Sequence, residues 1–595
     1  MTEHTLVRAT RESGSPVSAL VRATAAAMPD GVALKSGERV WTYDELSRAV
    51  GAAGVALRDA GVGRGDLVAL CTVRRPELAI ALLATFELGA VAMPVQDGLG
   101  AARMADAIGG GDVRAVVADA EHREVLQDAL AIEELASPGL ETSTTRQKAE
   151  QHPLACVLHT SGSTGVPKPV MLTHDGLANR LTWGQRTYPL GRGDVVLHQA
   201  APVFDFALWE LLAPLCFGAT VAVAPAGMEG EPGALAAFLR QNEVTCAHFV
   251  PSLLAEFLGE TCGAGLADLR YLFCGGEPLP AALVDQVRAS TEATLFNQYG
   301  PAEATIDCVA WQVPPRWSGA AVPIGTPISG TTAYVLDGVL EPVLDREAGV
   351  LHVGGRGLAW GYRGDPRATA AAFLPDPYAA TPGSRMYRTG DLAKQADGVL
   401  EFLGRADDQI KIRGVRVEPA AVEQVLSRHP GVAQAAVVPV TRAGRPGLAA
   451  HYVSAGPAGR AAGLRAFLSR NLPSAAVPAE ITAHETLPRL PTGKVDRPAL
   501  SRLSAAEAEP LPSQRPASAT EAKLAEIWKT LLQVEEIGPQ EDFFEAGGHS
   551  LLAMRLMARM RAAFGVRLPA RAIFDFPTVE ALARLIDQAH PGAAS

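Results

Sequence analysis

Residues 43–60 read YDELSRAVGAAGVALRDA, and residues 67–73 read LVALCTV. In the first stretch, apolar residues recur at the spacing of an amphipathic helix, whereas the second is an apolar run of the length of a buried strand. A second helical stretch follows from Pro76 to Leu88. The alternation continues from about residue 17 to about residue 340 and predicts an α/β fold with a largely parallel sheet.

The size and composition indicate a globular protein of several domains. A chain of 595 residues exceeds what one hydrophobic core usually supports, and its 48% hydrophobic and 20% charged residues are ordinary for globular proteins. The net charge of −11 argues against a nucleic-acid partner, because such a partner requires a basic surface. The sequence contains no apolar leader and no run of about 18 apolar residues, so we expect a cytoplasmic protein without a membrane partner.

The pattern changes in the last third of the chain. Residues 398–413 predict two short strands about a polar turn. Residues 418–440 predict a helix and then a strand, and residues 463–472 another helix, which together indicate a small α+β unit. Residues 501–518 are rich in Ser, Ala, Glu and Pro and predict a linker. Residues 519–590 are a series of amphipathic helices.

The stretch from Thr160 to Lys168, TSGSTGVPK, has the chemistry of a phosphate-binding loop. Glycines let the backbone approach an anion, hydroxyls donate hydrogen bonds, and a lysine supplies positive charge. The spacing differs from that of a Walker loop, and an ordinary Ser/Gly turn is the alternative. The candidate nucleotide-binding residues are Thr160, Ser161, Gly162, Ser163, Thr164, Gly165 and Lys168.

Seven motifs in order give the chain a family resemblance. They are WTYDEL (41–46), TSGSTGVPK (160–168), Phe204-Asp205, NQYGPAE (297–303), YRTGDL (387–392), GRADDQIKIR (404–413) and TGKVDR (492–497). Over nearly its whole length the chain resembles the adenylation domains of nonribosomal peptide synthetases, in the superfamily that includes acyl-CoA ligases and luciferases. The resemblance implies activation of a carboxylic acid by ATP with Mg²⁺.

A motif near the C-terminus resembles that of peptidyl carrier proteins. Residues 542–552 read DFFEAGGHSLL, and Ser550 begins a helical stretch with apolar residues at 552, 556, 560 and 564. The start of a helix favours a phosphate group, which a covalent phosphopantetheine arm on Ser550 would supply. The alternative is that Ser550 is only a helix N-cap.

The resemblance implies four segments. Residues 1–403 are expected to be a large α/β adenylation core, 404–500 a mobile α+β subdomain, 501–518 a linker, and 519–595 an all-α four-helix-bundle carrier domain. Asp407 matches the hinge about which the subdomain rotates between adenylation and thioester formation.

The resemblance also assigns roles to single residues. Lys168 and the loop hydroxyls would hold the β- and γ-phosphates, Glu303 would bind Mg²⁺, and Lys494 would stabilise the charge of the attacking carboxylate. Asp391 would bind the ribose, Tyr299 would flank the adenine, and Arg405 would complete the nucleotide site. Two positions depart from the family pattern: Ala302 stands where Thr is usual, and Val350 where Glu is usual.

Asp205 indicates an amino-acid substrate. In peptide synthetases this carboxylate pairs with the α-ammonium group, and an unpaired carboxylate in an apolar site is unfavourable. The remaining substrate positions are Phe206, Trp209, His248, Phe273, Gly275, Gln298, Ile306 and Asp307, closed by Lys494. Polar groups among aromatic ones favour a polar amino acid, either Glu/Gln-like or Ser/Thr-like, unless His248 and Asp307 simply satisfy each other.

Three functions remain open. The first is a free-standing adenylation–carrier didomain in natural product biosynthesis, which supplies a thioester to condensation or tailoring enzymes. It requires a phosphopantetheinyl transferase, and an MbtH-like protein is a further candidate partner. The second is a CoA ligase, against which Asp205 and the carrier motif argue. The third is a carrier scaffold with a degenerate adenylation unit, which Ala302 and Val350 alone favour.

Overall fold

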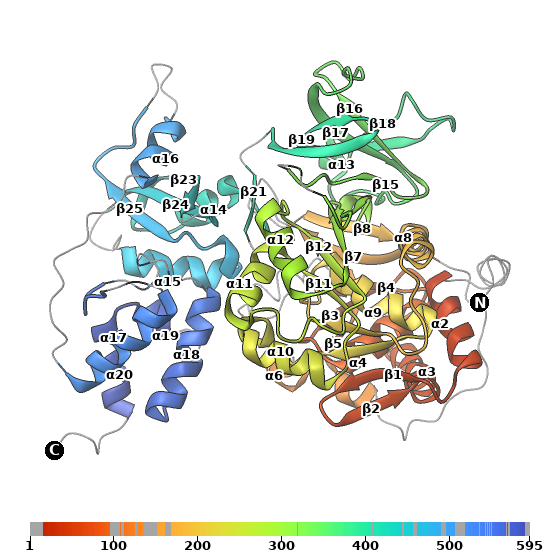
Figure 1. Ribbon diagram of the computed structural model, residues 1–595, viewed down its shortest axis with the longest axis horizontal. Coiled ribbons are helices and arrows are strands. Elements are labelled where there is room, and N and C mark those ends of the chain that lie inside the picture. Colours follow the sequence, from red (N-terminus) through yellow and green to blue (C-terminus); the bar gives the residue numbers. More distant parts are fainter. Residues whose placement is uncertain are drawn as a thin grey trace. The chain divides into compact units, whose positions relative to one another are not determined.

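The structure of the chain is a computed structural model. Its described residues form two compact units, one within residues 16–406 and the other within residues 409–589 (Figure 1). The structure describes residues 16–95, 108, 112–124, 126, 128–135, 152–160, 168–317, 319, 321–406, 409–412, 415–442, 445–455, 461–489, 495–505, 518–532, 534, 536–541, 543, 546, 548, 550–566, 568 and 572–589.

The first unit opens with the elements that the sequence predicts. Helix α3 covers Tyr43–Asp59, strand β3 covers Leu67–Cys71 and helix α4 covers Pro76–Glu87, so this predicted helix–strand–helix series is confirmed. A capping box starts α3: the Thr42 side chain accepts from the backbone N–H of Glu45, and the Glu45 carboxylate accepts from the backbone N–H of Thr42.

The larger sheet of this unit has nine strands. They are β1 (Val32–Ser36), β2 (Arg39–Thr42), β9 (Val195–His198), β10 (Thr220–Val223), β11 (Cys246–Phe249), β12 (Tyr271–Gly275), β13 (Thr294–Tyr299), β14 (Val309–Gln312) and β15 (Thr326–Pro327). Their order is β15-β14-β13-β12-β11-β9-β10-β1-β2. The strands from β13 to β1 run parallel, whereas β2, β14 and β15 are antiparallel to their neighbours. The predicted largely parallel sheet is confirmed.

A second sheet has six strands in the order β6-β5-β3-β4-β7-β8. Its other members are β4 (Val91–Pro94), β5 (Val113–Ala118), β6 (Leu130–Ala131), β7 (Leu154–Thr160) and β8 (Lys168–Thr173). All pairs are parallel except β7 with β8. The sequence predicted one sheet, but two form because β3, β4 and β7 pair with one another and not with the strands that follow α8 (His174–Thr187).

Alternating residues of the nine-stranded sheet face two hydrophobic cores. Val195 and Leu197 pack in one core with α10 (Pro232–Gln241), α11 (Pro251–Thr261) and α12 (Ala281–Ser290). Val196, between them, packs in the other core, which joins both sheets and contains residues of α4 and of α9 (Asp205–Phe217). Since α4 and α9 are buried on nearly every side, their mostly apolar sequences reflect burial inside the protein.

A third sheet is antiparallel and was not predicted. Strands β16 (Thr331–Leu336), β17 (Ala348–Gly355), β18 (Phe373–Pro375), β19 (Arg385–Ala396) and β20 (Val399–Arg405) form it. Because Gly404 and Arg405 pair with β19, the predicted boundary at residues 403 and 404 falls inside a strand of the first unit. The two short strands predicted within 398–413 exist, but β20 belongs to this sheet and β21 (Ile410–Ile412) pairs with β22 (Val415–Val417).

The second unit starts with an α+β arrangement, as predicted. Helix α14 (Pro419–Ser427) precedes β23 (Val432–Arg442), which pairs with β24 (Arg445–Ser454), and helix α15 covers Ala461–Asn471. The predicted linker needs correction at its start, because α16 covers Arg497–Ala505. Leu500 and Ser504 of this helix are buried. Their packing therefore stabilises a helix where the composition of residues 501–505 predicted a linker.

Helices alone follow in the C-terminal part of the described chain. They are α17 (Ala519–Leu532), α18 (Ser550–Phe564), α19 (Ala572–Asp575) and α20 (Val579–Ala589). Their shared core includes Trp528, which meets Phe543 edge-on at 4.9 Å between ring centroids. No helix among the described residues is long and apolar enough to cross a membrane.

Candidate active site

The predicted phosphate loop joins two antiparallel strands. Thr160 ends β7, Lys168 begins β8, and the two residues are register partners. The Thr160 hydroxyl donates to the backbone carbonyl of Lys168 at 3.4 Å, which closes the base of the loop. The loop residues Ser161, Gly162, Ser163, Thr164 and Gly165 lie outside the described residues, as do Asp407 and Lys494.

Lys168 and Glu303 both interact with the side chain of Tyr362. The Lys168 ammonium lies 5.6 Å from the ring centroid of Tyr362, and the Tyr362 hydroxyl donates to Glu303 Oε1 at 2.8 Å. Burial and the Glu303 carboxylate raise the pKa of Tyr362, so its phenol stays a donor. We call Lys168, Tyr362 and Glu303 the Glu303 group. Tyr362 was missed by the sequence analysis, although it lies in the aromatic and glycine-rich stretch WGYRG (360–364).

Glu303 has the properties of a magnesium ligand. It is fully buried in the short helical turn η2 (Ala302–Ala304), and its carboxylate offers the hard oxygen donors that Mg²⁺ prefers. Among the described residues, no cluster of three or more His, Cys, Asp or Glu could hold a metal ion. A single protein carboxylate together with phosphate oxygens is a usual ligand set of Mg²⁺.

Tyr299, Asp391 and Arg405 form a second cluster, which we call the Asp391 group. The Tyr299 hydroxyl donates to one oxygen of Asp391, and Arg405 Nη1 donates to the other at 2.5 Å. Burial, and then the Asp391 carboxylate, raise the pKa of Tyr299. Asp391 and Arg405 are register partners on β19 and β20, so the antiparallel sheet places this ion pair. All three sequence-predicted residues are brought together.

Four predicted substrate residues form an aromatic cluster, namely Phe206, Trp209, His248 and Phe273. Phe206 stacks on His248 at 3.3 Å between ring centroids, and Trp209 meets Phe273 edge-on at 4.9 Å. Phe206 and Trp209 come from the first turns of α9, whose first residue is the half-buried Asp205. Burial, and then the charge of Arg180, lower the pKa of His248 to about 3, so its ring is neutral at pH 7.

Gly275 and Gln298 adjoin the aromatic cluster. A Cβ atom at Gly275 would lie 3.3 Å from His248 Nε2 and 3.1 Å from the Gln298 carbonyl oxygen, which is tighter than ordinary contact. A side chain at this position would therefore crowd His248 Nε2. Gln298 precedes Tyr299 on β13, so neighbouring residues of one strand serve this cluster and the Asp391 group.

A tight turn carries the chain from Glu303 to Asp307. Thr305 and Ile306 both have positive φ angles, 60° and 70°, which are unfavourable for residues with side chains. The Thr305 hydroxyl secures the turn by donating to the Gly357 carbonyl at 2.6 Å. Gly300 is required here, because a Cβ atom at this residue would lie 2.3 Å from the Ile306 carbonyl oxygen.

Asp307 has a partner that the motifs do not include. Its Oδ2 accepts from Arg180 Nε at 3.0 Å and from Arg180 Nη2 at 2.6 Å, and both side chains are almost completely buried. Arg180 Nη1 also donates to the Tyr188 hydroxyl at 2.5 Å. The alternative in which His248 and Asp307 satisfy each other is thus wrong. Arg180 lies on α8, 127 residues before Asp307, and no local signal links the two.

The serine of the carrier motif lies at the start of a helix. Ser550 is the first residue of α18, and Leu552, Leu556 and Met560 are buried at the predicted spacing. Gly548 accommodates close packing, because a Cβ atom there would lie 2.3 Å from the Phe543 carbonyl oxygen. This position suits a phosphate-linked arm, since helix N-termini favour anions.

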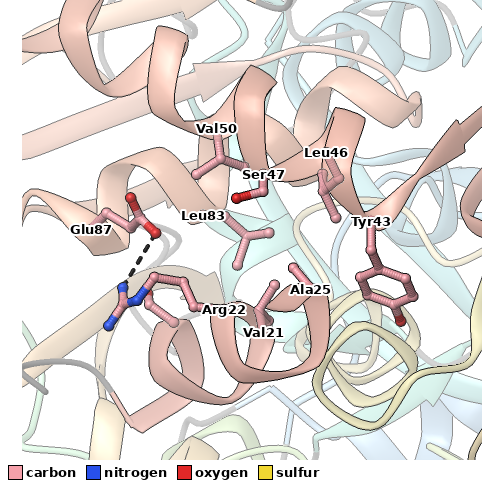
Figure 2. A pocket seen from close by; sticks show the side chains of 10 residues that line it. Val21, Arg22, Ala25, Tyr43, Leu46, Ser47, Val50, Leu83 and Glu87 are labelled. Carbon is pink, nitrogen blue, oxygen red and sulfur yellow. Dashed lines mark hydrogen bonds and ion pairs between the residues drawn. The ribbon is translucent and has the colours of Figure 1, made fainter. Parts of the chain in front are cut away.

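A small cavity elsewhere in the first unit contains none of the predicted site residues. It lies among α2 (Pro16–Ala27), α3 and α4, and Figure 2 shows its largely apolar lining with the 3.2 Å ion pair between Arg22 and Glu87. Because its two charged groups, Arg22 and Glu87, already pair with each other, we regard it as a packing seam.

Comparisons with known proteins agree with the motifs. Family models match for AMP-binding enzyme at residues 21–363, for AMP-binding enzyme C-terminal domain at 421–494 and for phosphopantetheine attachment site at 522–586. The expected cofactors are therefore confirmed at the level of the family: ATP with Mg²⁺, and a covalent phosphopantetheine.

Similar proteins include large synthetases. Tyrocidine synthase 3 of Brevibacillus parabrevis is 35% identical over 98% of this chain, which spans 9% of that protein. Phosphinothricin tripeptide synthetase PhsB of Streptomyces viridochromogenes is 38% identical over 97% of this chain, which spans 50% of that protein. The chain thus spans half or less of the length of these curated relatives.

A solved structure shares the architecture. An artificially fused adenylation–PCP didomain from Klebsiella oxytoca matches 97% of this chain and 99% of its own, with a TM-score of 0.72 and 25% identity. The predicted fold class, an α/β adenylation core with a C-terminal subdomain and a helical carrier region, is confirmed. The chain belongs to the family of AMP-binding enzymes, in the form that nonribosomal peptide synthetases use, with an adenylation region followed by a phosphopantetheine attachment region.

Proposed function

We propose that this chain activates a polar amino acid as its adenylate and transfers the aminoacyl group to a phosphopantetheine arm on Ser550. One observation carries the proposal: the segment from Gln298 to Asp307 contributes to the aromatic cluster, to the Asp391 group and to the Glu303 group. Gln298 adjoins the aromatic cluster, Tyr299 binds Asp391, and Glu303 binds Tyr362. Nucleotide and amino acid would therefore be held by one continuous stretch of chain.

In the first half-reaction, the substrate carboxylate attacks the α-phosphorus of ATP and pyrophosphate leaves. Such reactions depend on positioning and on neutralising charge. Lys168 would neutralise phosphate charge, and Lys494 would stabilise the attacking carboxylate. Asp391 would accept from the ribose hydroxyls while Arg405 and Tyr299 fix its orientation. Asp205 would pair with the α-ammonium group of the substrate.

In the second half-reaction, the phosphopantetheine arm supplies the thiol that accepts the aminoacyl group. We propose that rotation about Asp407 exchanges the catalytic surroundings between the two half-reactions, because one site must serve both. A phosphopantetheinyl transferase is the partner that would attach the arm, and condensation or tailoring enzymes would use the loaded carrier. An MbtH-like helper is a further candidate partner.

Exchange of labelled pyrophosphate into ATP tests the proposal. We expect exchange that depends on an L-amino acid, and little exchange with its des-amino analogue, because the ion pair between Asp205 and the α-ammonium group could not form. Loss of one partner of a buried ion pair costs about 3–5 kcal/mol, or about two to four orders of magnitude in affinity or rate. Exchange with the des-amino acid together with acyl-CoA formation would favour a CoA ligase. Absence of exchange with every acid would favour a carrier scaffold.

A further inference from the structure

A buried ion pair sets the charge beside the aromatic cluster. Arg180 and Asp307 form a two-point contact of 3.0 and 2.6 Å, with 1% and 4% of their side chains exposed. Burial raises the pKa of Tyr188, the third member of this contact, so it stays neutral. His248 is neutral as well. Because Tyr188 and His248 are neutral, the charges of these four residues are those of Arg180 and Asp307. The positive charge of Arg180 cancels the negative charge of Asp307.

Two buried polar atoms beside this pair lack a hydrogen-bond partner. They are His248 Nε2 and Gln298 Oε1, in residues that are 6% and 2% exposed. Both residues flank the position of the missing Gly275 side chain, where a Cβ atom would lie 3.3 Å from His248 Nε2 and 3.7 Å from Gln298 Cβ. Buried polar groups without partners are unfavourable, so a polar ligand at this position is expected to satisfy them.

The surroundings of these two atoms limit the size of such a ligand. Phe206 covers one face of the His248 ring, and Trp209 packs against both Phe206 and Phe273. A hydroxyl group can donate to the Gln298 oxygen, and it can donate to or accept from the imidazole, according to the tautomer of the ring. This packing of Phe206, Trp209 and Phe273 on one another favours a short side chain over a longer amide or carboxylate.

We infer that the substrate is an amino acid with a short, uncharged, hydroxyl-bearing side chain, of the class of serine and threonine, and that Arg180 is a positioning residue that makes the site electrically neutral by binding Asp307. This inference rests on the proposed function. It narrows the class of polar amino acids in that proposal to those with a short hydroxyl-bearing side chain, and it excludes glutamate-like substrates.

The first test compares amino acids in the pyrophosphate exchange assay. We expect kcat/KM for L-threonine or L-serine to exceed that for L-2-aminobutyrate, L-glutamine, L-glutamate and L-leucine by at least about 100-fold, because sites built to bind a hydroxyl reject analogues that lack it. A preference for any of the other four would overturn the inference while leaving the proposed function intact. Exchange with no amino acid would contradict both.

The second test removes the negative charge of the buried ion pair. In Asp307→Asn, Arg180 is left as an uncompensated cation, so we expect the ratio of kcat/KM for L-aspartate or L-glutamate to that for the best hydroxyl substrate to rise about 100-fold. The change should lower the KM of the acidic substrate and raise that of the hydroxyl substrate. General damage would instead reduce kcat for both.

A double variant covers the case in which Asp307→Asn does not fold. Arg180→Met/Asp307→Asn restores neutrality, and we expect it to reject acidic substrates as the parent does. The matched control is Asp194→Asn, which removes the carboxylate partner of Arg270 outside the aromatic cluster and should leave the order of substrates unchanged. Acceptance of glutamate by the double variant, or an unaltered order in a folded Asp307→Asn protein, would overturn the role of Arg180.

Discussion

Two ion pairs of this protein, one among the predicted nucleotide-binding residues and one among the predicted substrate residues, are assembled differently. Asp391 and Arg405 are 14 residues apart and are placed opposite each other by the hairpin of β19 and β20. Arg180 and Asp307 are 127 residues apart and meet only because α8 packs beside the turn that follows η2. The Asp391–Arg405 pair is thus placed by one hairpin, whereas the Arg180–Asp307 pair, and with it the charge balance beside the aromatic cluster, depends on tertiary packing.

This difference separates two kinds of variant. Changes in the Glu303 and Asp391 groups should weaken catalysis or nucleotide binding for every amino acid equally. Changes at Arg180, Asp307 or Gln298 should alter the order of amino acids. A variant in the Glu303 or Asp391 group that changes the order of preference among amino acids would contradict this difference.

The largest effect is expected for Lys494→Ala. This change would remove the cation that stabilises the attacking carboxylate, and loss of one such electrostatic contact typically lowers the rate about 10²–10³-fold. We expect pyrophosphate exchange to fall by this factor for every amino acid while the melting temperature stays that of the parent. An unaltered exchange rate would remove Lys494 from the catalytic residues.

A selective effect is expected for Asp407→Pro. Proline fixes the backbone φ angle and should hinder rotation at the predicted hinge. We expect pyrophosphate exchange near the parent rate and loading of the phosphopantetheine arm reduced about 100-fold, measured by the intact mass of the protein over time. An equal fall of both half-reactions would show that Asp407 is not a hinge.

Asp391→Asn should act on the nucleotide alone. Because charged hydrogen bonds contribute about 1.5–3 kcal/mol, we expect the KM for ATP to rise about 10- to 100-fold, with the order of amino acids unchanged. The matched control is Asp397→Asn, an exposed position on the same hairpin, where Asn tolerates the positive φ of 53°. A change of KM for the amino acid but not for ATP would contradict the assignment.

The smallest effect is expected for Tyr362→Phe, which removes one hydroxyl contact to Glu303. We expect the exchange rate to fall about tenfold, and the Mg²⁺ concentration for half-maximal exchange to rise, because one hydrogen bond to a charged group is lost. Tyr378→Phe removes a hydroxyl contact to the Leu340 carbonyl and is the matched control. Equal loss of activity in both variants would contradict a specific role of Tyr362.

The sequence predicted the parts of the fold that local patterns determine. The amphipathic period of α3 and the apolar run of β3 are local features, and both elements form as predicted. The division of the strands into separate sheets was missed because strand pairing is a long-range property. The composition of residues 501–505 predicted a linker, but these residues belong to a helix in which Leu500 and Ser504 are buried.

The same limit applies to the candidate site. The YRTGDL and GRADDQ motifs supplied Asp391 and Arg405, which the structure joins. Tyr362 and Arg180 were missed because their roles depend on partners 59 and 127 residues away. A buried arginine in a helix of mixed polarity gives no sequence signal of its partner.

Loading of the carrier tests the central claim most directly. The protein is first treated with a phosphopantetheinyl transferase and CoA and then incubated with ATP, Mg²⁺ and L-threonine or L-serine, and its intact mass is measured. We expect one phosphopantetheine and then one aminoacyl group per chain, and neither addition in Ser550→Ala, which should still exchange pyrophosphate at the parent rate. Aminoacylation of Ser550→Ala, or no aminoacyl addition to the arm-bearing protein with any amino acid, would contradict the account.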